Sequence, residues 1–162
     1  MPAARILEIH DLLTPSTVQV GMPGTTKEEV LNNLIDTLAD HTAVRDIDGV
    51  RRAVFEREHI MSTGVGKGLA LPHAKTGAVH ESIAAFAATD HPIDFGSIDD
   101  QPVRLIFLLV GTESAKSEHI KILSRVSRLM NRDRFRNRLL DARSPVEIMS
   151  IFEEGETELM ED

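Results

Sequence analysis

A glycine-rich segment that ends in a proline and a histidine is the part of this sequence best equipped for chemistry. Residues 62–74 read Ser-Thr-Gly-Val-Gly-Lys-Gly-Leu-Ala-Leu-Pro-His-Ala, with three of the chain's ten glycines inside five residues. Glycines at this density let backbone amides approach an anion, although they also suit a plain surface turn. The histidine, His73, follows a proline that fixes the local backbone, and an imidazole can carry a phosphoryl group at neutral pH.

Two common phosphate-binding motifs are absent from this segment. A P-loop needs a serine or threonine directly after its lysine, but Lys67 is followed by Gly68. A dinucleotide-binding fingerprint that begins at Gly64 and Gly66 needs a third glycine where Leu69 stands. The segment is therefore neither an ATP-binding loop of that type nor a nicotinamide site.

Composition excludes further classes of protein. The chain has no cysteine, which removes disulfides, thiolate metal sites and cysteine nucleophiles. None of its seven histidines stands in an HExxH pattern, and no GxSxG motif of a serine nucleophile occurs. We therefore expect neither a metal nor a cofactor.

Length and charge point to one domain with an acidic end. The 162 residues carry a net charge of −8, which argues against nucleic-acid binding. The longest apolar run, residues 105–110, is too short to span a membrane, and no signal peptide is visible, so we expect a cytoplasmic protein. Residues 153–162 hold six acids and no base, which predicts a domain over 1–152 and a disordered acidic tail. Residues 116–143, in contrast, hold nine bases and three acids.

Apolar spacing predicts alternating strands and helices. We expect helix caps at Thr25 or Thr26, at Asp46 or Asp48, and at Ser144. The helix over 116–130 should bury Ile120, Leu123, Val126, Leu129 and Met130. We expect strands over 16–22, 82–89 and 103–110, and a loop over 91–102. We expect helices over 26–40, over a segment that begins at 46 or 48 and ends before 62, over 116–130, over 132–140, and from 145 onward. The nearly continuous apolar character of 103–110 is typical of a strand covered on both faces, so we predict an α/β fold with helices on both sides of a sheet.

The segment around His73 also resembles a known family. Glu58, six further residues and then the run from Val65 to Ala74 resemble the phosphorylation-site signature of type 2 enzyme IIA components of the bacterial phosphoenolpyruvate-dependent phosphotransferase system. This is the fructose, mannitol and nitrogen-regulatory type. The similarity covers roughly residues 6 to 152 and includes the context of His119, while Ala74 stands where the family most often has glycine.

The resemblance implies a mixed sheet sandwiched between helices, as in anion-transporter-like domains, and it implies roles for particular residues. His73 would accept the phosphoryl group, Arg57 would neutralise its charge, and His119 would orient it. Phosphate would also contact Ser62, Thr63, Gly64 and Gly66, although a helix stop explains the first two equally well.

Two functions remain open on this resemblance. A phosphocarrier would take a phosphoryl group from a histidine phosphocarrier protein and pass it to a IIB component for sugar uptake. A nitrogen-regulatory protein would instead use the phosphorylation state of His73 to switch its binding to a target protein, with no sugar involved. A catalytically silent anion-transporter-like domain is disfavoured by the intact His73 signature. No nucleic-acid partner or membrane insertion is expected in either case.

Overall fold

A six-stranded mixed sheet lies at the centre of the computed structural model, which describes residues 8–161. The strand order is β1-β5-β6-β3-β2, and β4 also pairs with β6. β5 and β6 are antiparallel, as are β2 and β3, whereas β1 runs parallel to β5 and both β3 and β4 run parallel to β6. The strands are β1 (Val18–Met22), β2 (Gly64–Gly66), β3 (Leu69–Ala70), β4 (His73–Lys75), β5 (Ile83–Ile93) and β6 (Val103–Gly111).

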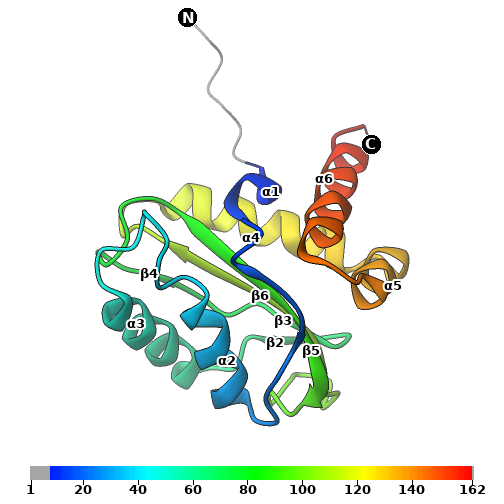
Figure 1. Cartoon of the computed structure of the whole chain (residues 1–162), viewed down its shortest axis with the longest axis horizontal. Helices are drawn as coiled ribbons and strands as arrows, with labels where there is room; N and C mark the ends of the chain where they lie inside the picture. The colour runs from blue at the N-terminus through cyan, green and yellow to red at the C-terminus, as the bar shows by residue number, and fades with distance from the viewer. Residues whose placement is uncertain (1–7, 162) are drawn as a thin grey trace, which may run out of the picture.

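Helices cover both faces of this sheet, which confirms the expected fold class (Figure 1). α2 and α3 pack on one face, and α1, α4, α5 and α6 pack on the other. The helices are α1 (Ile9–Leu12), α2 (Lys27–Asp36), α3 (Ile47–Ile60), α4 (Lys116–Met130), α5 (Asp133–Asp141) and α6 (Pro145–Glu161). Across residues 8–161, every helix is too short or too polar to traverse a lipid bilayer.

The two central strands alternate between the two cores over residues 83–88 of β5 and 105–110 of β6. Phe86 and Phe107 face the core under α4, α5 and α6, whereas Ile106 and Leu108 face the core under α2 and α3. Period-two alternation with an apolar residue at nearly every position is what a doubly covered strand requires. The prediction for 103–110 is therefore confirmed.

Helix caps follow the sequence closely. The Thr26 hydroxyl accepts a hydrogen bond from the Glu29 amide at 3.1 Å at the start of α2. The Asp46 carboxylate accepts one from the Asp48 amide at 3.1 Å at the start of α3. The Ser144 hydroxyl accepts from the Glu147 amide at 3.2 Å and starts α6. These predicted N-termini are confirmed, although α2 ends at Asp36 rather than at residue 40 and continues only as turns.

Two details of the sequence-based prediction are wrong. β5 extends to Ile93, into the expected loop, because Ile93 is buried and pairs with Val103 of β6. In α4, Ile120 is 65% exposed, and the inward positions belong to His119 and Ile122 instead. Ile120 was predicted to be buried because it is apolar. Helical spacing would have selected His119 instead, because it lies three residues before Ile122 and therefore on the same face of the helix.

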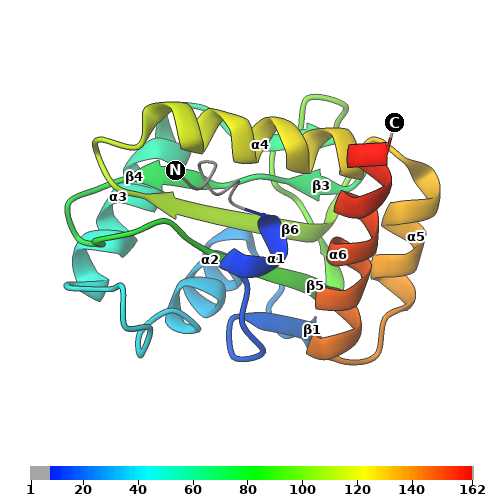
Figure 2. The same cartoon turned by 90° about the horizontal axis from the view of Figure 1, so that it is seen from above.

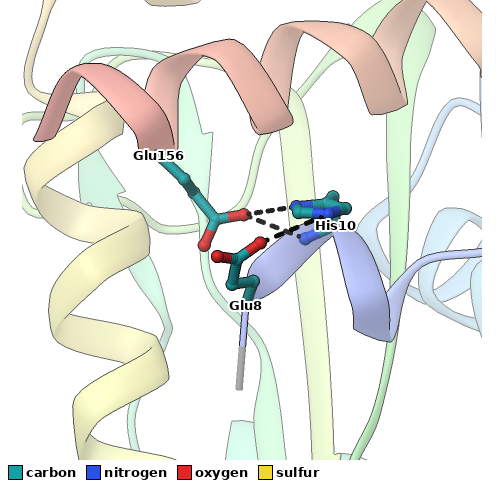
Figure 3. Close-up of side chains that lie close together, drawn as sticks. All are labelled: Glu8, His10 and Glu156. Atoms are coloured by element: carbon teal, nitrogen blue, oxygen red, sulfur yellow. Dashed lines mark hydrogen bonds and ion pairs between the residues drawn. The ribbon is translucent and has the colours of Figure 1, made fainter. Parts of the chain in front are cut away.

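The expectation of a disordered tail from residue 153 is also wrong. α6 continues to Glu161, and its buried face includes Phe152, Glu156 and Leu159 at helical spacing. The Glu156 carboxylate accepts hydrogen bonds from the backbone amides of Ile9 at 2.8 Å and His10 at 3.0 Å. Figure 3 shows this carboxylate of α6 reaching the imidazole of His10 in α1, with Glu8 beside it.

Charge pairing explains why the acidic segment folds. Glu156 lies 3.3 Å from the guanidinium of Arg125 in α4. Two further acids of α6 reach bases of the segment 116–143, with Glu154 at 2.7 Å from Arg138 and Glu158 at 3.8 Å from Arg132. A count of net charge treats the acids as mutually repelling, whereas the fold places each of these three beside a base.

Candidate functional site

His73 is held at the start of the short strand β4, which pairs with β6. It pairs with Leu109 of β6, and the Leu109 amide donates a hydrogen bond to the Pro72 carbonyl at 3.0 Å. Because side chains alternate along a strand, Ala74 points into the core while His73 and Lys75 share the outer face. The imidazole is half-buried, so its position is fixed while part of it remains open to solvent.

The hydrogen bond made by the ring determines which nitrogen of His73 can react. Nδ1 lies 2.8 Å from the Leu71 carbonyl oxygen, which only accepts, so Nδ1 carries the proton and the lone pair is on Nε2. Burial lowers the pKa of His73, the positive charges of Arg57 and Lys75 lower it further, and the Leu71 contact and the Glu58 charge oppose them. His73 is therefore a neutral imidazole near pH 7.

His119 lies directly beside His73. Their ring centroids are 5.4 Å apart, and His119 is only 4% exposed in the first turn of α4. Within residues 8–161, neither of its ring nitrogens has a hydrogen-bond partner. Burial, followed by the charges of His73 and Lys75, lowers the pKa of His119 to about 4. Gly111 makes room for this ring, because a Cβ there would lie 3.0 Å from Nδ1 of His119.

Arg57 completes the group that the resemblance singled out. It lies in the last turn of α3, where its guanidinium donates a hydrogen bond to the Met61 carbonyl at 3.0 Å. Its charge is among the causes of the lowered pKa of His73, so it lies within electrostatic reach of that ring. The site thus draws on the end of α3, the start of β4 and the first turn of α4, and Figure 2 shows β4 and the N-terminal end of α4 at the same end of the molecule.

The glycines upstream of His73 build a hairpin. β2 and β3 are joined by Lys67 and Gly68, both with positive φ (59° and 77°), the geometry of a tight two-residue turn. Gly64 allows close packing, because a Cβ there would lie 2.3 Å from the hydroxyl oxygen of Ser97. This hairpin accounts for the glycine density without an anion.

The hydroxyls of this segment are engaged within the protein. Ser62 donates to the Phe95 carbonyl at 2.6 Å, and the Thr63 hydroxyl donates to the Glu58 carboxylate. A contact of Ser62, Thr63, Gly64 or Gly66 with phosphate therefore stays a prediction.

Sequence reasoning missed Lys75. Its ammonium charge lowers the pKa of both His73 and His119. The signal was available, because a residue two positions after His73 on a strand shares its face.

Known proteins resemble the chain along most of its length. The family model described as "Phosphoenolpyruvate-dependent sugar phosphotransferase system, EIIA 2" matches residues 11–155. A nitrogen regulatory protein of Bradyrhizobium diazoefficiens is 35% identical over 90% of this chain and 94% of its own length. A fructose-specific EIIABC component of Bacillus subtilis is also 35% identical, over 90% of this chain but only 23% of its own length. The crystal structure of nitrogen regulatory protein IIA-Ntr from Neisseria meningitidis superposes with a TM-score of 0.84 at 29% identity, covering 89% of this chain and 98% of that one.

Proposed function

Because this chain belongs to the EIIA 2 family of the phosphoenolpyruvate-dependent sugar phosphotransferase system, we propose that it is a phosphohistidine carrier in which Nε2 of His73 accepts the phosphoryl group. The observation that carries this proposal is the hydrogen bond from Nδ1 of His73 to the Leu71 carbonyl. That bond keeps the proton on Nδ1 and leaves Nε2 as the nucleophile of a half-buried, neutral ring.

The surrounding residues suit the charge of a transferring phosphoryl group. In the reaction, a bond forms between Nε2 of His73 and phosphorus while the bond from phosphorus to the donor's histidine nitrogen breaks, and no proton of His73 has to move first. Arg57 and Lys75 bring positive charge to the site. The buried imidazole of His119, neutral because its pKa is about 4, has a ring N–H without a partner in the described chain that a phosphoryl oxygen would satisfy.

Exposed apolar side chains flank these residues in the sequence and suit docking to another protein. Ile60 and Met61 follow Arg57 at the end of α3 and are 80% and 69% exposed, and Ile120 follows His119. Large apolar groups clustered at a surface favour protein–protein contact. We propose that the donor is a histidine phosphocarrier protein.

Two onward routes for the phosphoryl group are supported to a similar degree. Transfer to a IIB component for sugar uptake follows from the fructose-specific relative of Bacillus subtilis. A regulatory switch follows from the nitrogen regulatory relatives, one of which matches this fold along 98% of its chain. Phosphorylation of His73 is the step that both routes share.

Intact mass spectrometry tests this shared step. After incubation with phosphoenolpyruvate, enzyme I and the histidine phosphocarrier protein, the chain should gain one phosphoryl group that acid removes and alkali does not. His73→Ala should gain none, whereas His80→Ala, which changes an exposed histidine, should gain it normally. Phosphate on the His73→Ala protein, or on Ser62 or Thr63, would contradict the proposal. Adding a IIB component to the phosphorylated chain then separates the two onward routes.

A further inference from the structure

Glu58, the acid with which the signature begins, has no part in the transfer described so far. It is 6% exposed, yet its carboxylate is fully engaged. The Thr63 amide donates to it at 2.8 Å, the Thr63 hydroxyl donates to its other oxygen, and the Lys27 ammonium lies 2.8 Å away. A buried carboxylate is tolerated when it is paired and hydrogen-bonded in this way.

A series of hydrogen bonds leads from Glu58 to the reactive imidazole. Thr63, clamped by Glu58 at its amide, accepts a hydrogen bond at its carbonyl from the Leu71 amide at 3.0 Å. The Leu71 carbonyl in turn accepts from Nδ1 of His73 at 2.8 Å. Pro72 stiffens this last link, because the residue before a proline is restricted to extended conformations.

Lys27, which pairs with Glu58 at the other end of this series of hydrogen bonds, is also held in place. Lys27 lies in the first turn of α2, where its ammonium donates to the Phe95 carbonyl at 3.3 Å and lies 4.5 Å from the centre of the Phe95 ring. Glu58 therefore connects α2 and α3 to the peptide segment that carries Thr63, and the position of its carboxylate is fixed from both sides.

We propose that Glu58 is a positioning residue for His73: by clamping Thr63, and through it Leu71, it holds the imidazole in the Nδ1–H tautomer with Nε2 directed outward. This inference rests on the proposed role of His73 as phosphoryl acceptor. Because the Glu58 side chain is buried, we expect its effect to appear in turnover and not in the KM for the carrier protein.

The experiment compares isosteric variants along the series. Glu58→Gln removes the charge that pairs with Lys27, and Thr63→Val removes the hydroxyl donor while keeping the amide. Thr63→Ser keeps the hydroxyl and serves as the conservative rescue. Glu56→Gln, at an exposed position of the same helix, is the matched control.

The primary readout is the ¹⁵N NMR spectrum of the His73 ring in the unphosphorylated protein. The parent, Thr63→Ser and Glu56→Gln should show the Nδ1–H tautomer. Glu58→Gln and Thr63→Val should show a substantial Nε2–H population, and their turnover in phosphoryl transfer should fall by about 10-fold to 100-fold, as expected for a misplaced reacting group. Their KM for the carrier protein should stay within about twofold of the parent value.

A single Nδ1–H tautomer and parental turnover in both Glu58→Gln and Thr63→Val would overturn the inference. If Glu58→Gln does not fold, the comparison of Thr63→Val with Thr63→Ser decides the question. Because the tautomer is measured without phosphate, a failure of this inference can be told apart from a failure of the mass-spectrometric test of His73.

Discussion

Burial is the main cause of the lowered pKa of His73 and of His119, and one lysine adds to it at both rings. The charge of Lys75 lowers the pKa of both His73 and His119, so Lys75→Met should raise both values. NMR titration of the ring protons measures this directly. Lys121→Met, an exposed change on α4, should leave both titrations unchanged, and a Lys75→Met protein with parental titration curves would show that the lysine does not act on the site.

Arg57 should matter for transfer far more than for folding. Its guanidinium is partly exposed and makes one hydrogen bond to the Met61 carbonyl, so Arg57→Ala should change the free energy of unfolding by less than about 0.5 kcal/mol. Loss of a donor that stabilises developing charge typically slows a reaction by about 10² to 10³. Phosphoryl-transfer kinetics and urea denaturation measure the two effects.

Arg52→Ala is the matched control for this prediction, because Arg52 is 69% exposed on the same helix and its ion pair with Asp46 is loose at 3.8 Å. It should leave both rate and stability near the parent. A large loss of stability with Arg57→Ala would assign Arg57 to the fold instead.

At the scale of elements, α6 should depend on one buried acid. Glu156→Ala removes the acceptor of the Ile9 and His10 amides and the carboxylate 3.3 Å from the Arg125 guanidinium, and breaking a buried pair of this kind typically costs about 3 to 5 kcal/mol. Urea denaturation should show that loss. Glu158→Ala, an exposed acid 3.8 Å from Arg132, should cost less than about 1 kcal/mol. Equal losses in the free energy of unfolding for the two variants would mean that the buried contacts of Glu156 stabilise the fold no more than an exposed ion pair does.

The elements themselves were largely predictable, because caps and apolar spacing are local signals. Ser144 and Asp46 start their helices as predicted, and the apolar run 103–110 became a doubly covered strand. The helical structure of residues 153–161 could not be predicted in the same way. Their acids are stabilised by partners far away in the chain, such as the Ile9 amide, and a local count of charge contains no information on those partners.

The same distinction holds at the site. His73, Arg57 and His119 were identified from a resemblance. The structure places His119 beside His73, and the charge of Arg57 contributes to the lowered pKa of His73. The hydrogen bond from His73 to Leu71 spans two residues, yet spacing alone did not reveal it, because it depends on the backbone course set by Pro72. The unpartnered ring of His119 is likewise a property of packing, which no sequence pattern records.

For the whole molecule, His10 and His119, whose pKa values shift in opposite directions on folding, should produce a maximum of stability near neutral pH. Burial lowers the pKa of His10, but its hydrogen bond with Glu156 and the charges of Asp11, Glu156 and Glu8 outweigh burial and raise the pKa above 6.5. The stabilisation from protonated His10 is therefore complete below pH 6.5 and is lost as the pH rises through that raised pKa. The pKa of His119 moves from 6.5 to about 4 on folding, so the unfolded chain binds its proton first and stability falls as the pH drops from 6.5 towards 4.

Urea denaturation between pH 4 and pH 9 tests this balance. His10→Gln should flatten the decline above pH 6.5, and His119→Gln should make the decline below pH 6.5 shallower. Identical pH profiles for the parent and both variants would show that these histidines do not govern the pH dependence.

The bond between α1 and α6 has a consequence for how the chain acquires its structure during synthesis. The amides of Ile9 and His10 donate to a carboxylate 147 and 146 residues further along the chain, so this acceptor becomes available only once Glu156 has left the ribosome. The sheet has no such requirement, because β6 ends at Gly111. α1 should therefore dock after the sheet has formed, and in refolding the slow hydrogen exchange of the Ile9 amide should appear later than that of Phe107 in the centre of β6.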